Sequence, residues 1–178
     1  MDTAVALDEG RFGLRTWVRR RWCPAGVRPP WVVAETYEWA WVHVAVEPTT
    51  GRCVVLYLPA MDGACCEVFL RAVAEAFPGQ RVGVVLDNAP GHTSGAVAWP
   101  EALVPLPLPP YSPELNPAEQ LFRVLRQALA NRVFADLTEL EAALTEALRA
   151  YWDEPPRLRR LTAYPWWADG VAGIATSS

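Results

Sequence analysis

The stretches TAVALD (residues 3–8) and VGVVLD (residues 82–87) decide the fold of this chain. Each is a short apolar run followed at once by an aspartate, the pattern of a buried strand that delivers an acid at its end. A helix capped by Asp62 is predicted between them. A right-handed crossover through this helix makes the two strands parallel neighbours, so Asp8 and Asp87 are expected side by side at the carboxyl edge of a sheet.

The rest of the pattern predicts a mixed sheet of about five strands with helices on both faces. Alternating aromatic and β-branched residues predict a hairpin from Tyr37–Val46 and Cys53–Leu58. Another strand is expected over Ala102–Leu106. Two helices follow, one starting at Asn116-Pro117 and one running from Asp136 to about Trp152. This order of elements is typical of an α/β fold.

Length and composition exclude several classes of protein. The chain has 178 residues, of which 52% are hydrophobic, so one compact domain is expected. All 16 basic residues are Arg, which excludes a Walker-type phosphate loop and a Schiff-base Lys. No apolar run approaches the ~18 residues of a membrane span, and no basic signal-peptide region is present. A cytoplasmic protein without a membrane partner is expected.

Charge is segregated along the chain, although the net charge is only −4. The segment 10–31 contains six Arg and no acid, and Trp17 and Trp22 are interleaved with them. Arginine interleaved with aromatic residues suits phosphate pairing beside a stacking surface, but a solvated surface hairpin explains the same charges. The candidates for DNA contact are Arg15, Arg19, Arg21, Arg123 and Arg126.

A third acid, Glu119, begins the helix 32 positions after Asp87. Three carboxylates brought together repel one another, so they stay ionised only with a cation among them, and Mg²⁺ suits oxygen ligands of this kind. Two such ions could activate a water or a 3′-hydroxyl on one side of a phosphodiester and steady the leaving oxygen on the other. Simpler explanations stay open, because an Asp can cap a turn and Glu119 can close a capping box or pair with Arg123.

Three strings carry a resemblance to a known family. They are LDEGRFGLRTWVRRRWCPAGVRPP from Leu7, LDNAPGHTS from Leu86 and LPPYSPELNPAEQLFRVLR from Leu108. Together they resemble the catalytic domain of mariner-superfamily transposases and their bacterial insertion-sequence relatives, over roughly Ala4 to Leu148. The most specific feature is DNAPGH followed by PPYSPELNPAE in that order.

The resemblance implies an RNase H-like fold with an Asp-Asp-Glu triad that binds two Mg²⁺ or Mn²⁺ ions. Carried over residue by residue, the triad is Asp8, Asp87 and Glu119. In the family these acids direct nicking at transposon ends and then attack of the freed 3′-hydroxyl on target DNA. Asn88 and His92 match positions near the metal site, although His92 could equally be a turn histidine bonded to local backbone.

The resemblance also sets expectations for domains and partners. Residues 1–152 are expected to form the catalytic domain, and residues 153–178 a tail of unknown role. The first triad acid is so close to the start that no helix-turn-helix module precedes it, so DNA-end recognition is expected from a separate or missing module. DNA is the expected partner, and a homodimer is left open.

The expected function is that of a transposase catalytic domain, a metal-dependent DNA endonuclease and strand transferase. One alternative is a noncatalytic remnant or interaction module that keeps the fold. Another is an RNase H-like nuclease that acts on RNA hybrids or junctions, which the PPYSPELNPAE string disfavours.

Overall fold

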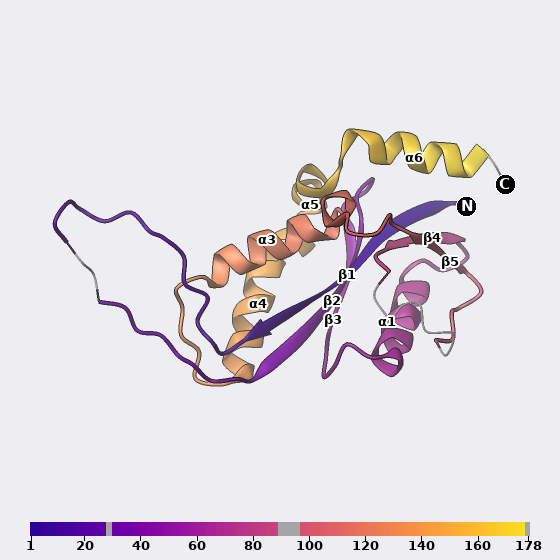
Figure 1. Ribbon diagram of the computed structural model, residues 1–178. Helices are drawn as coiled ribbons and strands as arrows, with labels where there is room; N and C mark the ends of the chain where they lie inside the picture. Colours follow the sequence, from indigo (N-terminus) through magenta and orange to yellow (C-terminus); the bar gives the residue numbers. More distant parts are fainter. Residues whose placement is uncertain (28–29, 89–96, 177–178) are drawn as a thin grey trace.

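The computed structural model describes residues 1–27, 30–88 and 97–176. Within these residues, five strands form one mixed sheet: β1 (Thr3–Gly13), β2 (Trp39–Glu47), β3 (Arg52–Leu58), β4 (Val82–Leu86) and β5 (Leu103–Pro107). Their order across the sheet is β3-β2-β1-β4-β5. β1, β4 and β5 are parallel, whereas β2 is antiparallel to both β1 and β3 (Figure 1). The predicted mixed sheet is therefore confirmed.

β1 is longer than the sequence pattern predicts. The apolar run ends at Leu7, but the strand continues through Asp8 to Gly13. β4 pairs with β1 only as far as Ala6, whereas β2 pairs along it to Gly13. The hydrogen bonds to β2 therefore keep the strand extended where the apolar pattern has stopped. The expected strand end at Asp8 is wrong, and Asp8 lies inside β1 beyond the end of its parallel neighbour.

The predicted helix caps form as expected at two positions. α1 (Gly63–Ala76) begins after Asp62, whose carboxylate accepts a hydrogen bond from the N–H of Cys65 at 2.9 Å. α4 (Leu137–Trp152) begins after Asp136, which accepts from the N–H of Glu139 at 2.9 Å. Both carboxylates satisfy N–H groups that have no partner within the helix, so these local signals fix where the helices start.

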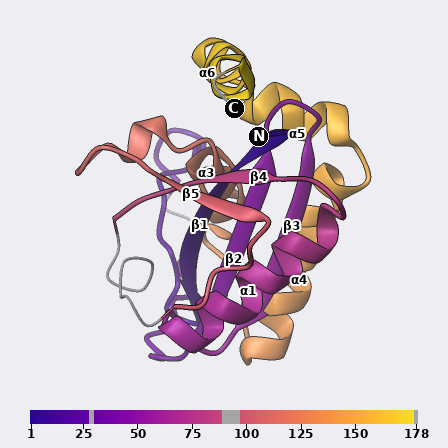
Figure 2. The ribbon, with the colours of Figure 1, turned by 90° about the vertical axis from the view of Figure 1, so that its right-hand side faces the viewer.

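Helices cover both faces of the sheet, as expected (Figure 2). On one face, Phe69, Leu70 and Val73 of α1 are fully buried against β1 and β4. On the other face lie α3 (Ala118–Leu129), α4 and α5 (Pro155–Thr162). The even-numbered residues of β1 point toward α3, so this face of the strand also carries Asp8.

The segment after Asp153 packs back onto the fold. Leu158 and Thr162 of α5 are fully buried, and Trp167 of α6 (Pro165–Thr176) is 3% exposed. Leu158 and Trp167 join the core that α3 and α4 share with the sheet. Among the described residues, no helix has the length and apolar character needed to cross a bilayer.

An arm, described for residues 14–27 and 30–38, lies between β1 and β2 and projects away from the rest of the molecule (Figure 1). Its two limbs are hydrogen-bonded near the base, where the N–H of Leu14 donates to Glu38 O and the N–H of Thr16 donates to Ala34 O, both at 3.0 Å. Farther out it exposes large apolar side chains, among them Trp22. The sheet therefore presents an arm rich in Arg and Trp that its own core does not cover.

Phe122 of α3 is the side chain that seats this helix on β1. Its ring is fully buried, and a Cβ atom built on Gly10 would lie 2.5 Å from it. Phe122→Ala should therefore lower the free energy of unfolding by about 3–5 kcal/mol in urea denaturation. Val68→Ala, at a 47% exposed position of α1, is the control and should cost less than about 0.5 kcal/mol. Equal losses in the two variants would contradict this packing.

Candidate active site

Asp8 and Asp87 come together because the register of two parallel strands places them there. Ala6 of β1 is paired with Val85 of β4, and the same register continued by two residues sets Asp8 opposite Asp87. β4 ends at Leu86, so both carboxylates lie where the sheet opens at the carboxyl end of that strand. This is the neighbourhood expected from the sequence.

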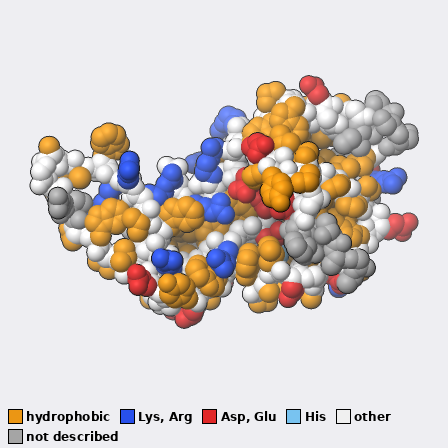
Figure 3. All heavy atoms as spheres, in the orientation of Figure 1, with side chains coloured by type: hydrophobic (Ala, Val, Ile, Leu, Met, Phe, Trp, Pro, Cys, Tyr) orange, Lys and Arg blue, Asp and Glu red, His pale blue; other side chains and the backbone are white. Residues whose placement is uncertain are grey.

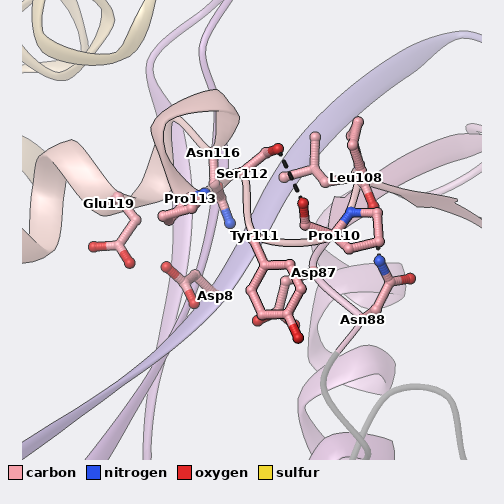
Figure 4. Close-up of a pocket in the computed structure, with 11 residues that line it drawn as sticks. Asp8, Asp87, Asn88, Leu108, Pro110, Tyr111, Ser112, Pro113, Asn116 and Glu119 are labelled. Atoms are coloured by element: carbon pink, nitrogen blue, oxygen red, sulfur yellow. Dashed lines mark hydrogen bonds between the residues drawn. The ribbon is translucent and has the colours of Figure 1, made fainter.

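Glu119 reaches the same place from a third element. It lies in the first turn of α3, after a proline-rich loop that contains a short 3₁₀ helix, η1 (Pro113–Leu115). With the two aspartates it lines a hollow of about 470 Å³ (Figure 4). The other residues that line this hollow are Asn88, Leu108, Pro109, Pro110, Tyr111, Ser112, Pro113 and Asn116.

Asn116 fixes the start of α3 against β1. Its side chain is 3% exposed, its amide group donates to the carbonyl oxygen of Leu7 at 2.9 Å, and its amide oxygen accepts from the N–H of Ala118 at 3.0 Å. The helix begins at Ala118 with Pro117 as its N-cap residue, so the predicted cap at Asn116 lies one residue too early, although its amide oxygen still accepts from the first helical N–H. The link to Leu7 could not be predicted, and it holds Glu119 beside the strand that carries Asp8.

The side chain of Glu119 makes neither the Arg123 ion pair nor the capping-box hydrogen bond that the sequence allows. Its Oε2 lies 3.6 Å from Nη1 of Arg126, two turns along the helix. Arg123 instead donates to the side-chain oxygen of Gln120. The N–H of Asn116, which a capping box would use, donates to Pro113 O at 2.9 Å. The Arg123 pair and the capping box are therefore wrong as accounts of Glu119, whose carboxylate faces the hollow.

Burial and neighbouring charge favour a proton on Asp8. Burial first, and then the carboxylates of Glu119, Glu9 and Asp87, raise the pKa of Asp8 from 3.8 to about 8, while a hydrogen bond from the N–H of Glu9 acts in the opposite direction. Asp8 is therefore largely protonated at neutral pH without a cation nearby. A positive ion in the hollow would reverse this preference, because it stabilises the ionised carboxylate.

The donor set suits a hard divalent cation. Carboxylate oxygens are the ligands that Mg²⁺ and Mn²⁺ prefer, and three of them face one hollow. In the described part of the chain, no three Asp, Glu, His or Cys side chains are close enough to hold one ion together as they stand. The open hollow leaves room for ions that complete their coordination with water or phosphate.

Two further residues of the hollow come from the loops that frame it. The amide group of Asn88 donates to Leu108 O at 2.8 Å, which ties the end of β4 to the loop after β5. Tyr111 has φ 60° and is fully exposed, and it lines the same hollow as Asp87 (Figure 4). Sequence reasoning did not single out Tyr111, although it lies inside the PPYSPELNPAE string. His92 lies outside the described residues.

The opposite face of β1 carries a buried contact between Glu9 and His43 next to Asp8. Nδ1 of His43 lies 3.5 Å from Oε1 of Glu9, and both side chains are almost completely buried. Nε2 of His43 is 3.2 Å from Ala60 O. His43 is thus a packed core residue, and it lies outside the hollow.

The five arginine candidates lie on the arm and on α3. Arg21 lies 5.1 Å from the ring centre of Trp31 and donates to Pro30 O at 3.3 Å, while Arg15 faces Tyr37. The N–H of Arg19 donates to the side chain of Asn131. Arg side chains gather over the arm and its base, beside the acidic hollow (Figure 3). Basic side chains therefore flank the site that the acids form.

The raised pKa of Asp8 predicts how stability depends on pH. A group with a higher pKa in the folded state favours folding at low pH, and this contribution is lost between about pH 4 and pH 8. In EDTA, Asp8→Asn should therefore gain stability over the wild type as pH rises through this window, by about 1–3 kcal/mol after allowance for solvent screening. Urea denaturation at several pH values measures the difference.

The control for that experiment is Glu146→Gln, which removes an exposed carboxylate of α4. It reports the effect of deleting a negative charge far from the hollow. A stability difference for Asp8→Asn that does not change between pH 4 and pH 8 would show that Asp8 is not held in the protonated form.

Comparison with known proteins identifies the family and the fold. The model of the DDE superfamily endonuclease family matches residues 3–141. A protein of Sinorhizobium fredii (strain NBRC 101917 / NGR234), called uncharacterized protein y4pE/y4sA, is 28% identical over 130 residues, which make up 72% of this chain and 96% of that protein.

Solved structures of a transposase share the architecture. The pre-cleavage Mos1 transpososome matches with a TM-score of 0.63 and 21% identity, and the Mos1 paired-end complex with the left transposon end matches with 0.62 and 22%. These matches cover 97% and 89% of this chain, but only 56% and 53% of the transposase chains. The chain thus spans about half their length. Its fold is RNase H-like, and with a family match over most of its residues the chain belongs to the DDE superfamily endonucleases.

Proposed function

We propose that this chain is a transposase catalytic domain, a metal-dependent DNA endonuclease and strand transferase. The observation that carries the proposal is that Asp8, Asp87 and Glu119 line one hollow from three different elements. The family is named for an endonuclease activity, and similar structures are Mos1 paired-end complexes with Mg and with Mn. We propose these three acids as the catalytic residues and the ligands of two Mg²⁺ or Mn²⁺ ions.

The residues of this chain have separable tasks in such a reaction. A pair of divalent ions would activate a water or a 3′-hydroxyl and stabilise the leaving oxygen. Asp8 must give up its proton for this, and positive charge in the hollow would favour that loss by lowering its raised pKa. Asn116 keeps Glu119 against β1 through its hydrogen bonds to Leu7 and Ala118. Asn88 holds the loop at the other side of the hollow.

DNA would lie across the hollow and the basic surface beside it. Arg15, Arg19 and Arg21 on the arm and Arg123 and Arg126 on α3 are the proposed phosphate contacts. The acidic hollow alone would repel the phosphate backbone. Arginines beside it offset this repulsion and therefore favour DNA binding. We further propose that residues 1–152 form the catalytic unit, and that a separate helix-turn-helix module reads the transposon ends.

Metal binding gives a direct test of the three acids. A ligand that binds only the folded state stabilises it, by about 2.7 kcal/mol at a hundredfold excess over Kd. Mg²⁺ or Mn²⁺ should therefore raise the melting temperature of the wild type at pH 8. Asp87→Asn should abolish this rise and leave the metal-free protein at least as stable, because one repulsive charge is gone. Differential scanning fluorimetry with and without EDTA measures both effects.

Glu101→Gln, outside the hollow and in the turn before β5, is the matched control and should keep the full metal response. An equal rise in the wild type and in Asp87→Asn would place the metal elsewhere. A chain that binds metal but never nicks DNA, even with a DNA-reading module supplied, would instead favour a noncatalytic module that keeps the fold.

The arm gives a second test through the salt dependence of DNA binding. Each lost phosphate contact reduces the slope of log K against log salt by ~0.9 on duplex DNA. Arg19→Ala combined with Arg21→Ala should therefore flatten the slope by almost two units, measured by fluorescence anisotropy. Arg20→Ala is the neighbouring control and should change it less. An unchanged slope in the double variant would assign these charges to a solvated surface.

A further inference from the structure

A second, smaller hollow lies where the arm meets the far end of α3, and we call it the arm-base pocket. It has a volume of about 190 Å³. Its floor is apolar, and Phe12, Leu129 and Phe134 there are nearly completely buried. None of the described residues that line it carries a carboxylate. Four arginines line it instead: Arg11, Arg15, Arg126 and Arg132.

Aromatic rings hold these arginines in place. The guanidinium carbon of Arg11 lies 4.2 Å from the ring centre of Trp39, and that of Arg132 lies 5.0 Å from Phe134. Among the described residues, one of the four pocket arginines lies within ion-pair range of a carboxylate. It is Arg126, and its partner is Glu119. A guanidinium stacked on a ring keeps its N–H groups available at the edge, so the pocket is prepared for an anion.

Trp17 supplies a flat apolar surface at the mouth of this pocket. Its side chain is 51% exposed, although it lies at the base of the arm where the chain is well anchored. The N–H of Asn131 donates to Trp17 O, and the side chain of Asn131 accepts from the N–H of Arg19, both at 2.8 Å. Asn131 has φ 61°, in the left-handed region that Asn tolerates better than most residues. The Trp17 backbone is therefore fixed while its ring stays open to a ligand.

The arm-base pocket faces the same side of the sheet as the acidic hollow. Asp8 and Phe12 point to one face of β1, and four residues of strand span ~13 Å. A stacked DNA strand advances ~3.4 Å per nucleotide, so a strand with one phosphate at Asp8 reaches the pocket about four nucleotides away. Arg126 lies between the two hollows, paired with Glu119 and 5.8 Å from the ring centre of Trp17.

We infer that the arm-base pocket binds one unstacked nucleotide of the DNA strand held in the acidic hollow. The base lies against Trp17, and its phosphate pairs with the surrounding arginines. A single nucleotide joins a flat ring system to an anion, which matches an apolar floor with a basic rim. The volume of about 190 Å³ is below the roughly 300 Å³ at which small-molecule sites begin, so only the base would enter the pocket, with the sugar and phosphate at its arginine rim. This inference rests on the proposed function in taking DNA as the substrate.

The test separates binding of the base from binding of the phosphate. The probe is a short single-stranded deoxyoligonucleotide, compared with the same strand made abasic, each titrated into the full chain in EDTA. Trp17→Ala should weaken binding of the normal strand about tenfold and leave binding of the abasic strand within about twofold. Trp17→Phe, which keeps a ring, should restore most of the affinity. Arg132→Gln should weaken both strands and flatten the salt slope by ~0.7.

Matched controls exist elsewhere on the surface. Trp166→Ala removes a 44% exposed Trp from α6, and Arg149→Gln removes an exposed Arg from α4. Both should keep wild-type affinity for both strands. Equal effects of Trp17→Ala on normal and abasic strands, or an effect no larger than that of Trp166→Ala, would overturn the inference.

Two further outcomes are decisive. If Trp17→Ala leaves DNA affinity unchanged but dissociates an oligomer in sedimentation, the pocket holds a second copy of the chain and the nucleotide assignment is wrong. Because the titration is done in EDTA, it does not depend on the three acids. An intact metal response without a Trp17 effect overturns this inference alone, whereas a Trp17 effect without a metal response overturns the proposed metal site alone.

Discussion

β1 pairs with β4 only up to Ala6 but with β2 as far as Gly13, and the candidate site depends on this difference between its two edges. Beyond Ala6, β2 continues to pair with the strand, but β4 has reached its end. The space that β4 leaves is where Asn116 donates to Leu7 O and where Asp8 faces the hollow. An uneven pair of parallel strands thus provides both a rigid support and an open edge for a ligand.

Gathering acids at this edge has an electrostatic consequence that reaches into the arm. Burial and like charge keep a proton on Asp8, while Glu119 is balanced by Arg126. Arg126 also contacts the rings of Phe12 and Trp17 at the arm-base pocket. A cation in the hollow would compete with Arg126 for Glu119. The acidic hollow and the arm-base pocket therefore share the side chain of Arg126, so a cation bound in the hollow would change the charge balance in the pocket.

The chain contains three asparagines, and each joins two separate parts of the molecule. Asn88 ties the end of β4 to Leu108, Asn116 ties α3 to β1, and Asn131 ties α3 to the arm. A side-chain amide can donate and accept at once, which suits it to bridge backbone groups where regular pairing ends. These bridges hold the elements that surround the two hollows.

The sheet, the starts of α1 and α4 and the neighbourhood of the three acids could be predicted from the sequence, because these follow from local signals. Apolar runs ending in Asp, capping side chains and the DNAPGH and PPYSPELNPAE strings each act within a few residues. The extension of β1 to Gly13, the pair of Glu119 with Arg126 and the bond of Asn116 to Leu7 appear only in the folded chain. These outcomes depend on partners that periodicity does not reveal, such as the antiparallel β2 or residues over a hundred positions away. The arm-base pocket exists for the same reason, since its walls come from β1, the arm and α3 and meet only in the folded chain.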